Sequence, residues 1–372
     1  MDFEGVLLSW YLKNKRNLPW RNTRDPFRIW LSEVILQQTR VQQGLPYYFS
    51  FLKKYSSINK LAAAPEDEVL KLWQGLGYYS RGRNLHYTAK QIVSHYKGVF
   101  PKTFDELKKL KGVGDYTAAA ISSFCFNEVQ AVVDGNVYRA LSRIFGIETP
   151  IDSTEGKKEF RELANELVSK RNPGEYNQAI MEFGAMQCVP KNPDCEKCPF
   201  VQFCVARKKK LVSVLPIKSK KTKITNRYFH YLVIRHKGNV YLKKRTEKDI
   251  WKNLHDFPLI EMKKKISDKK LVQTKEWKCV FLKSKIVVKG FSEERKHLLS
   301  HQKLFVRFVE LEVLDKLDTH HPDPPRANRP SSGRKVMEKN KFLYVKEKEL
   351  KKYAVPVVIA DYLKKDFNPQ RV

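Results

Sequence analysis

Four cysteines lie within 17 residues of the chain, and thiolates gathered this closely bind metal. Cys188, Cys195, Cys198 and Cys204 follow the spacing C-x6-C-x2-C-x5-C. Such a set can hold either a zinc ion or a cubane [4Fe–4S] cluster. Structural zinc sites usually contain two tight C-x2-C pairs, whereas this sequence has one pair and two wide gaps. The spacing therefore favours the larger cluster over zinc, and both over disulfides.

Two carboxylates lie in settings that could support acid–base chemistry. Glu33 flanks the apolar stripe of a predicted helix, where a glutamate is commonly just solvated. Asp134 directly precedes the predicted helix 137–145, in the N-cap position that aspartate fills well. Because helix N–H groups favour the ionised form of a capping carboxylate, we expect Asp134 to stay charged, so capping and catalysis are compatible.

A glycine-rich turn at 110–120 opens a helix of small residues. Gly112 and Gly114 allow close backbone approach and conformations that other residues avoid. Free N–H groups at the start of a helix bind phosphate, and Lys111 adds a positive charge. This pattern predicts a hairpin that holds a DNA backbone without reading sequence. An ordinary helix–turn–helix corner is the alternative.

Aromatic, glycine and arginine residues combine in the stretch 73–83, which includes Tyr78 and Arg83. Stacking on bases and contact with phosphate is one interpretation, and core aromatics beside exposed arginines is the other. Uncharged amides, among them Gln38, follow the Glu33 helix and could contact base edges.

The elements that must position these residues fall into two regions. Residues 1–205 are predicted to be mostly helical, with apolar residues at helical spacing in 6–12, 27–35 and 137–145. A basic linker at 206–222 separates them from an α+β domain at 223–367. In that domain we predict strands at 228–234, 240–242, 278–288 and 304–313, a last helix at 357–367, and a flexible Pro-rich insertion at 318–335.

The formal charge of +32 indicates a polyanionic partner. It divides into +10 up to residue 210 and +22 beyond it. Cys125 and Cys279 stand alone among apolar neighbours, and neither a signal peptide nor a membrane-spanning run is recognisable. We therefore expect an intracellular protein that is not secreted, cytoplasmic beside the nucleoid in a bacterium or nuclear in a eukaryote, with no membrane partner.

Six stretches of the chain form a highly specific combination with the cysteine set. They are LPWR (18–21), WLSEVILQQT (30–39), LWQGLGYYSRGRNLH (72–86), LKGVGDYTAAAI (110–121), VVDGNV (132–137) and NQAIMEFGAMQC (177–188). Together they resemble the MutY family of adenine DNA glycosylases, within the helix-hairpin-helix superfamily that includes endonuclease III. The match spans most of residues 15–205, and residues 223–367 resemble the family's Nudix-like domain more weakly.

The resemblance implies an architecture. An all-α helix-hairpin-helix glycosylase domain with an iron–sulfur cluster loop is expected in residues 1–205. It would comprise a six-helix subdomain at about 24–130 and an iron–sulfur subdomain formed by 1–23 and 131–205. An α+β Nudix-like domain that recognises 8-oxoguanine would follow. The glutamate-rich Nudix helix motif is absent from the sequence, so no pyrophosphatase activity is expected.

The resemblance also implies roles for individual residues. The catalytic set is the acid Glu33, which protonates the adenine, the sugar-stabilising carboxylate Asp134, and the supporting residues Tyr116 and Asn136. The substrate-binding set is Trp20, Arg21 and Gln178 in the adenine pocket, Gln38 and Tyr78 wedged into the duplex, and Ser300 and His301 at the 8-oxoguanine. The phosphate set is Gly112, Gly114, Lys111 and Arg83, and the four cysteines hold a [4Fe–4S] cluster.

Three positions depart from the family pattern. Leu299 replaces a phenylalanine before Ser300 and His301, which weakens the assignment of His301. Lys111 and Asp115 replace a proline and an arginine in the hairpin. Lys111 still suits phosphate, whereas Asp115 is unfavourable beside DNA unless it points away.

The predicted function is hydrolysis of the N-glycosidic bond of adenine paired with 8-oxoguanine or guanine in double-stranded DNA, by a monomer. Tyr116 occupies the place where lyases of the superfamily carry a nucleophilic lysine, so a monofunctional glycosylase is expected. The alternatives are an endonuclease III-type glycosylase/lyase for oxidised pyrimidines, a non-catalytic DNA-binding iron–sulfur protein, and a zinc-dependent DNA-binding module.

Overall fold

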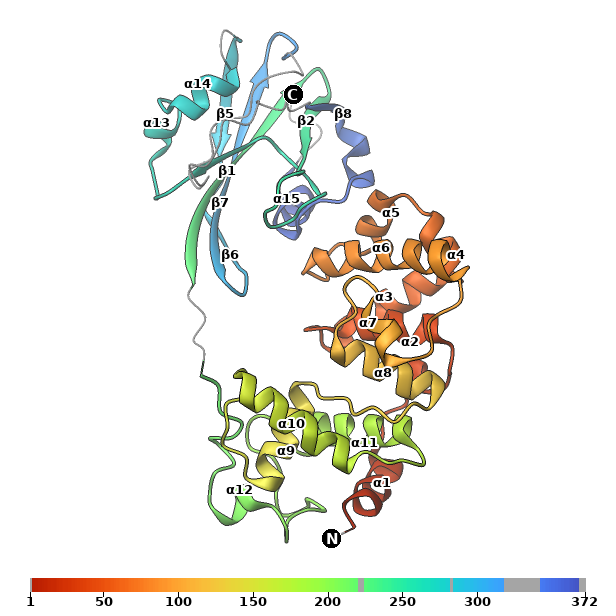
Figure 1. The fold of residues 1–372 in the computed structure, drawn as a ribbon. Coiled ribbons are helices and arrows are strands. Elements are labelled where there is room, and N and C mark those ends of the chain that lie inside the picture. Colours follow the sequence, from red (N-terminus) through yellow and green to blue (C-terminus); the bar gives the residue numbers. More distant parts are fainter. Residues whose placement is uncertain (1, 220–223, 282–283, 318–341, 368–372) are drawn as a thin grey trace. The chain divides into compact units, whose positions relative to one another are not determined.

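The chain forms two compact units in a computed structural model that describes residues 2–219, 224–281, 284–317 and 342–367. The first unit consists of Met1–Ala64 and Arg81–Lys221, and the second of Pro65–Ser80 and Thr222–Val372 (Figure 1). The predicted insertion at 318–335 lies outside the described residues.

The first unit is built from helices, as the sequence predicts. They are α1 (Phe3–Asn14), η1 (Pro19–Arg21), α2 (Pro26–Leu36), α3 (Val41–Lys54), α4 (Ile58–Ala63), α6 (Tyr79–Tyr96), α7 (Phe104–Lys108), α8 (Asp115–Phe126), α9 (Gly135–Phe145), α10 (Thr154–Leu167), α11 (Pro173–Met186) and α12 (Val205–Lys208). Helices α1 and α9–α12 group in one half of the unit, and α2–α4 with α7 and α8 in the other (Figure 1).

Local signals in the sequence place the ends of the helices that matter most. The Asp25 side chain accepts from the Phe27 N–H, and Pro26 occupies the first position of α2. Asp134 caps α9, and Gly146, with a φ of 73°, ends it in the left-handed conformation. The predicted helices within 6–12, 27–35 and 137–145 are confirmed as parts of α1, α2 and α9.

Helices α1, α9 and α11 share one apolar core, in which Leu7, Leu141 and Phe183 are almost fully buried. The chain after α12 packs against this unit as far as it is described. The Ile151 N–H donates to the Ile217 carbonyl at 3.0 Å, and Leu215 is buried beside Cys204. The first part of the basic stretch 206–222 is therefore held in place.

The second unit contains a mixed sheet. Its strands are β1 (Thr225–His236), β2 (Asn239–Lys244), β3 (His255–Asp256), β4 (Leu259–Met262), β5 (Ile286–Phe291), β6 (Arg295–Leu298), β7 (Gln302–Val313) and β8 (Leu343–Lys346). The main path is β3-β2-β1-β7-β5, with β4 paired to β1, β6 to β7 and β8 to β2. Strands β1 and β7 run parallel from the Thr225–Gln302 pair to the Arg235–Glu312 pair.

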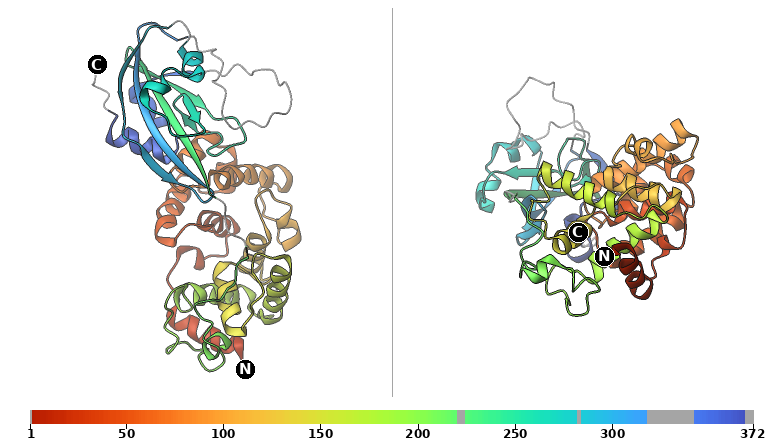
Figure 2. Two further views of the ribbon diagram at one scale, coloured as in Figure 1. Left: turned by 90° about the vertical axis from the view of Figure 1, so that its left-hand side faces the viewer. Right: turned by 60° about the horizontal axis from the view of Figure 1, so that its bottom comes forward.

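Helices cover both faces of this sheet (Figures 1 and 2). On one face, α13 (Asp268–Leu271) and α14 (Lys275–Phe281) pack on Leu232, Val309 and Leu311. On the other, Tyr362 of α15 (Val357–Lys365) stacks on Phe308 at 3.9 Å between ring centroids. The unit also includes α5 (Glu66–Leu72) and a 3-10 helix, η2 (Glu347–Lys352).

One predicted strand is wrong in its first half. Residues 278–288 were expected to be extended, but 275–281 form α14 and the strand begins at Ile286. Trp277, Val280 and Phe281 recur at three- and four-residue spacing and bury one helical face in the core, which decides the conformation. The other predicted strands are confirmed within β1, β2 and β7, and the predicted last helix at 357–367 is confirmed except for its final two residues, because α15 ends at Lys365.

No helix in the described ranges combines the length and the apolar composition that crossing a bilayer requires.

Candidate active site and DNA-binding elements

Glu33 is buried on α2, with 5% of its surface exposed, so it is not the solvated boundary residue that its helical position alone would allow. The pKa of Glu33 is raised to about 7, mainly by burial and in smaller part by the nearby charge of Asp134. The Tyr116 hydroxyl donates a hydrogen bond to Glu33 Oε2 at 2.5 Å, which acts in the opposite direction. A carboxyl group in this environment can hold a proton at neutral pH.

Asp134 accepts three hydrogen bonds at the start of α9. Its Oδ1 accepts from the N–H groups of Asn136 and Val137, each at 2.8 Å, and its Oδ2 accepts from Asn136 Nδ2 at 2.8 Å. Burial nevertheless raises the pKa of Asp134, with these hydrogen bonds opposing the rise. The expectation that capping alone sets the charge is therefore too simple, because desolvation outweighs it.

Arg139 joins this carboxylate to the cysteine loop. Its Nη2 donates to Asn136 Oδ1 at 2.8 Å, and its Nε donates to the Cys188 carbonyl at 2.7 Å. Nη2 also donates to the Gly184 carbonyl on α11 at 2.5 Å. The arginine thus fixes the amide that holds Asp134 Oδ2 and the backbone of the first cysteine at the same time.

Arg21 and Gln178 line a polar cavity of about 440 Å³ in the first unit. The Tyr11 hydroxyl, from the same wall, donates to Gln178 Oε1 at 3.1 Å. Trp20 is buried and packs edge-to-face on Tyr48, with ring centroids 5.2 Å apart. The charge of Arg21 also lowers the pKa of Glu33, which places this guanidinium near the buried acid.

Glu182 holds Arg21 in position. It is almost fully buried and accepts from Arg21 Nη2 at 2.8 Å and from Arg16 Nη2 at 2.6 Å. Burial alone would raise the pKa of Glu182, but the hydrogen bonds from the two arginines outweigh it and lower the pKa to about 2. A buried carboxylate paired with two guanidinium groups keeps the wall of the cavity rigid.

The glycine-rich turn joins α7 to α8 as predicted. Gly112 has a φ of 77°, and a Cβ there would lie 2.8 Å from Asn84, so this position requires glycine. Gly114 has extended backbone (φ −93°, ψ −179°) that any residue adopts, which corrects the expectation for it. A Cβ at Gly114 would meet open space in the described structure, so any need for glycine there comes from close approach of a ligand.

Asp115, the unfavourable residue of the hairpin, is paired with two cations. Lys108 Nζ lies 2.8 Å from its carboxylate, and Arg161 forms a second ion pair. The hydrogen bond from Lys108 and the charges of both partners lower the pKa of Asp115. Asp115, Lys108 and Arg161 together therefore carry a net positive charge. Lys111 extends over the Tyr87 ring at 4.5 Å.

Gln38 and Tyr78 both adopt the left-handed backbone conformation, with φ values of 54° and 44°. Such a conformation costs about 1–3 kcal/mol in a non-glycine residue and is concentrated at functional sites. Arg81 holds the backbone next to Gln38 by donating to the carbonyls of Ile35 and Gln37 at 2.8 and 2.5 Å. Arg83 is half-buried in the first turns of α6.

Ser300 and His301 are exposed in the turn between β6 and β7. Within the second unit, the Ser300 hydroxyl forms a hydrogen bond with the Tyr78 hydroxyl. The structure therefore brings together a residue expected to wedge into the duplex and a residue expected at the 8-oxoguanine.

The four cysteine thiols influence one another electrostatically. The pKa of Cys198 is raised to about 12, mainly by burial and in smaller part by the charges of Cys188, Cys204 and Cys195. Arg143 Nη1 lies 3.5 Å from Cys188 Sγ, and the Cys204 thiol donates to the Arg143 carbonyl at 3.4 Å. The guanidinium of Arg143 beside Cys188 fits a group that carries negative charge when thiolates ligate it.

Among the described residues, no three or more His, Cys, Asp or Glu side chains lie in an arrangement that would hold a single metal ion.

Sequence reasoning missed Arg139, Arg143 and Glu182. The two arginines are four residues apart on α9, between apolar positions such as Leu141, and both are largely buried. A pair of cations repeated along one face of an otherwise apolar helix was the available signal. For Glu182, the available signal was a single charged residue among apolar residues of α11 that are themselves buried.

Comparison with known proteins gives the class and then the family. Residues 31–170 match the family model described as "HhH-GPD superfamily base excision DNA repair protein", and residues 230–365 match that of the NUDIX domain. A thermostable thymine-DNA glycosylase of known structure is similar in fold, with a TM-score of 0.52 and 31% identity, over 56% of this chain and 95% of the other. The chain is thus a DNA glycosylase of the helix-hairpin-helix class followed by a Nudix domain, as predicted.

Similar proteins of known name identify the family within this class. The adenine DNA glycosylase of Buchnera aphidicola subsp. Schizaphis graminum is 36% identical over 276 residues, which cover 74% of this chain and 77% of that protein. The adenine DNA glycosylase of Homo sapiens is 44% identical over 216 residues, covering 56% of this chain and 40% of that protein. The chain belongs to the adenine DNA glycosylase family.

Proposed function

We propose that the protein hydrolyses the N-glycosidic bond of adenine that faces 8-oxoguanine or guanine in duplex DNA, acting as a monomer. The observation that carries the proposal is the buried pair of carboxyl groups. Glu33 has a pKa of about 7 and one hydrogen-bond donor, Tyr116, whereas Asp134 has three hydrogen bonds that favour its ionised form. Environments that separate two carboxyl groups in this way assign the acid and the charge stabiliser.

The chemistry follows from that asymmetry. Protonated Glu33 donates its proton to a ring nitrogen of the flipped adenine, which makes the base a neutral leaving group as the C1′–N9 bond breaks. The electron pair of that bond leaves with the adenine, and the sugar becomes a cation. Ionised Asp134 stabilises this cation, and water then adds to C1′ and loses a proton.

Tyr116 supports a monofunctional reaction. Its hydroxyl is engaged with Glu33, and burial raises its pKa well above the usual range, so the phenol stays protonated. It cannot form the Schiff base through which lyases open the sugar. Efficient trapping of a protein–DNA adduct by borohydride would contradict this part of the proposal.

The adenine pocket is assigned to Trp20, Arg21 and Gln178. Arg21 and Gln178 line the same polar cavity, and the charge of Arg21 acts on Glu33. Trp20, next to Arg21 in the chain, is not among the residues that line this cavity and supplies buried aromatic surface against Tyr48. Guanidinium and amide groups can satisfy the edge of a purine, and an apolar wall desolvates the reacting bond.

DNA is held by the hairpin and distorted by two strained residues. The N–H groups at the start of α8 after Gly112 and Gly114, with Lys111 and Arg83, bind phosphates. Gln38 and Tyr78 enter the base stack, and the backbone strain at both positions supports this role.

Ser300 is proposed to distinguish 8-oxoguanine from guanine, with a lesser contribution from His301. The lesion carries an N7–H donor and an O8 acceptor that guanine lacks, and a hydroxyl can pair with either. A site built for these groups leaves polar atoms unpaired in the wrong complex. The hydrogen bond between Ser300 and Tyr78 supports a common site.

Cys188, Cys195, Cys198 and Cys204 are proposed to hold a [4Fe–4S] cluster. When bound, the cluster would cross-link the 188–204 loop and supply no step of the excision. Arg143 beside Cys188 offsets the negative charge of the thiolates. The ordered loop presents basic residues, including Lys191 and Lys197, to DNA phosphates.

A single-turnover assay tests the function. Duplexes carry adenine opposite 8-oxoguanine, guanine, cytosine or thymine, with an oxidised pyrimidine duplex as the control for the endonuclease III alternative. We expect fast release of adenine opposite 8-oxoguanine, slower release opposite guanine, and no release opposite thymine. Equal release from all four pairs, or release of the oxidised pyrimidine alone, would overturn the proposal.

A further inference from the structure

The turn that carries Ser300 is fixed at its base by backbone hydrogen bonds. It is closed by the Leu299 N–H, which donates to the Gln302 carbonyl at 2.8 Å. The Thr225 N–H, at the start of β1, donates to the His301 carbonyl at 3.0 Å. Thr225 and Gln302 are paired in the parallel β1–β7 ladder, so the turn is attached to the first residues of both strands.

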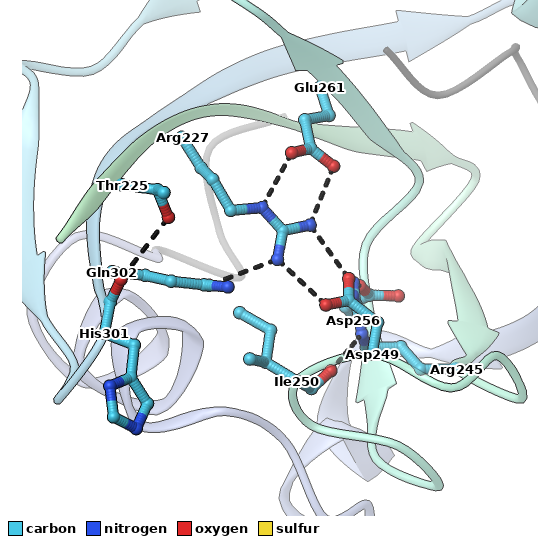
Figure 3. A network of polar contacts seen from close by, with 9 residues as sticks. All are labelled: Thr225, Arg227, Arg245, Asp249, Ile250, Asp256, Glu261, His301 and Gln302. Atoms are coloured by element: carbon cyan, nitrogen blue, oxygen red, sulfur yellow. Dashed lines mark hydrogen bonds and ion pairs between the residues drawn. The ribbon is translucent and has the colours of Figure 1, made fainter. Parts of the chain in front are cut away.

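The Gln302 side chain links the turn to a buried cluster of charged residues around Arg227 (Figure 3). Arg227 Nη1 donates to Gln302 Oε1 at 3.2 Å. The same guanidinium forms two bonds to Glu261, at 2.7 and 2.9 Å, and two to Asp249, at 2.9 and 2.8 Å. A guanidinium has five N–H donors. All five are engaged, so the Arg227 head group has a single orientation.

The cluster is rigid for a second reason. Arg245 donates to Asp249 Oδ2 at 3.0 Å and to Asp256 Oδ2 at 2.6 Å, which holds Asp249 from its other side. Arg227, Arg245, Asp256 and Glu261 are each less than 10% exposed. Buried ion pairs of this kind contribute little net stability but restrict geometry, so a role in positioning accounts for them better than a role in folding.

We propose that Gln302 and Arg227 are positioning residues for lesion selectivity, because they fix the turn that presents Ser300 to the base opposite the adenine. The inference rests on the proposed function of Ser300. A displacement of a recognition group by about 1 Å can cost about a hundredfold in rate, so loosening the turn should reduce selectivity without abolishing excision.

The test compares Gln302→Leu, which removes the acceptor for Arg227, with Gln302→Glu, which keeps one. Single-turnover excision rates are measured for adenine opposite 8-oxoguanine and opposite guanine, and their ratio is the readout. We expect Gln302→Leu to lower this ratio at least about tenfold, almost entirely through the 8-oxoguanine duplex. Gln302→Glu should stay within about threefold of the wild-type ratio.

One control variant and one further test variant separate selectivity from stability. Arg235→Gln loosens the ion pair with Glu347 at the far end of β1 and should lower the melting temperature without changing the ratio. Arg227→Lys keeps the charge but loses the paired hydrogen bonds, and it should lower the ratio further than Gln302→Leu. An unchanged ratio in Gln302→Leu, or an equal fall in both rates, overturns the inference.

Ser300→Ala distinguishes the inference from the function beneath it. If the wild type excises adenine but Ser300→Ala retains the wild-type ratio, the proposed role of Ser300 fails. If Ser300→Ala loses selectivity and Gln302→Leu keeps it, only the positioning role fails.

Discussion

Removal of the Tyr116 hydroxyl is expected to move the pH dependence of excision upward. This hydroxyl donates to Glu33 at 2.5 Å and partly offsets the effect of burial, so that the pKa of Glu33 with the hydrogen bond in place is about 7. A hydrogen bond to a charged group contributes about 1.5–3 kcal/mol. One pKa unit corresponds to about 1.4 kcal/mol, so Tyr116→Phe should raise the pKa of Glu33 by at least about one unit.

The sign of the effect follows from the role of Glu33 as an acid. Excision requires the protonated form, so the rate falls as the pH rises through the pKa of Glu33. In the wild type this alkaline limb should lie near pH 7, and in Tyr116→Phe near pH 8 or above. The variant should therefore lose less of its own maximal activity between pH 7 and 8.

Single-turnover rates measured from about pH 5.5 to 9.5 decide the matter. Tyr138→Phe is the matched control, because Tyr138 lines the same cavity as Tyr116 but interacts with Arg161 and Asp115. Its alkaline limb should coincide with that of the wild type. A limb for Tyr116→Phe at the wild-type position or below it would refute the reasoning, as would wild-type activity that rises with pH.

Four further predictions follow. Glu33→Gln should reduce excision by at least about a hundredfold while DNA affinity, measured by fluorescence anisotropy, stays near that of the wild type. Compared with the wild type, the same variant should be more stable to unfolding by up to about 3 kcal/mol above pH 7 and equally stable below pH 4.5. The reason is that the Glu33 carboxyl ionises with a pKa of about 4.5 in the unfolded chain but only near 7 in the folded protein. Thermal melts at pH 4 and pH 8 check this. Arg139→Gln should lower the single-turnover rate about tenfold or more by releasing Asn136, with normal iron content as the control measurement. Cys198→Ser should abolish absorbance near 400 nm and lower both melting temperature and DNA affinity, whereas a colourless, fully active wild-type protein would contradict the cluster assignment.

The parts of the fold that could be predicted are those determined by local chemistry. Asp134 and Gly146 delimit α9 because a side-chain acceptor and a left-handed residue are needed at those two ends. The β1–β2 hairpin follows from apolar strands on either side of Lys237–Gly238, both of which have positive φ. Such signals act within a few residues, so they can be read without knowledge of the tertiary structure.

The site was predictable in its residue types but not in its environment. The helical position of Glu33 predicts a boundary residue, and only the packing of α8 on α2, which brings Tyr116 over it, explains its burial. The pairing of Asp115 with Arg161 joins residues 46 positions apart, and no local pattern announces it. The predicted strand at 278–288 failed for a different reason, because burial of Trp277, Val280 and Phe281 on one face favours a helix over its first part.

In the proposed mechanism, the different roles of the two carboxyl groups depend on how many hydrogen bonds each accepts rather than on burial. Both groups are desolvated, and desolvation raises the pKa of each. Each donated hydrogen bond favours ionisation, and Asp134 receives three, two of them from α9 backbone groups that cannot turn away. Glu33 receives one, from a side chain. In the proposed reaction, these hydrogen bonds favour Asp134 as the group that stays charged while the sugar becomes positive, and Glu33 as the group that supplies the proton.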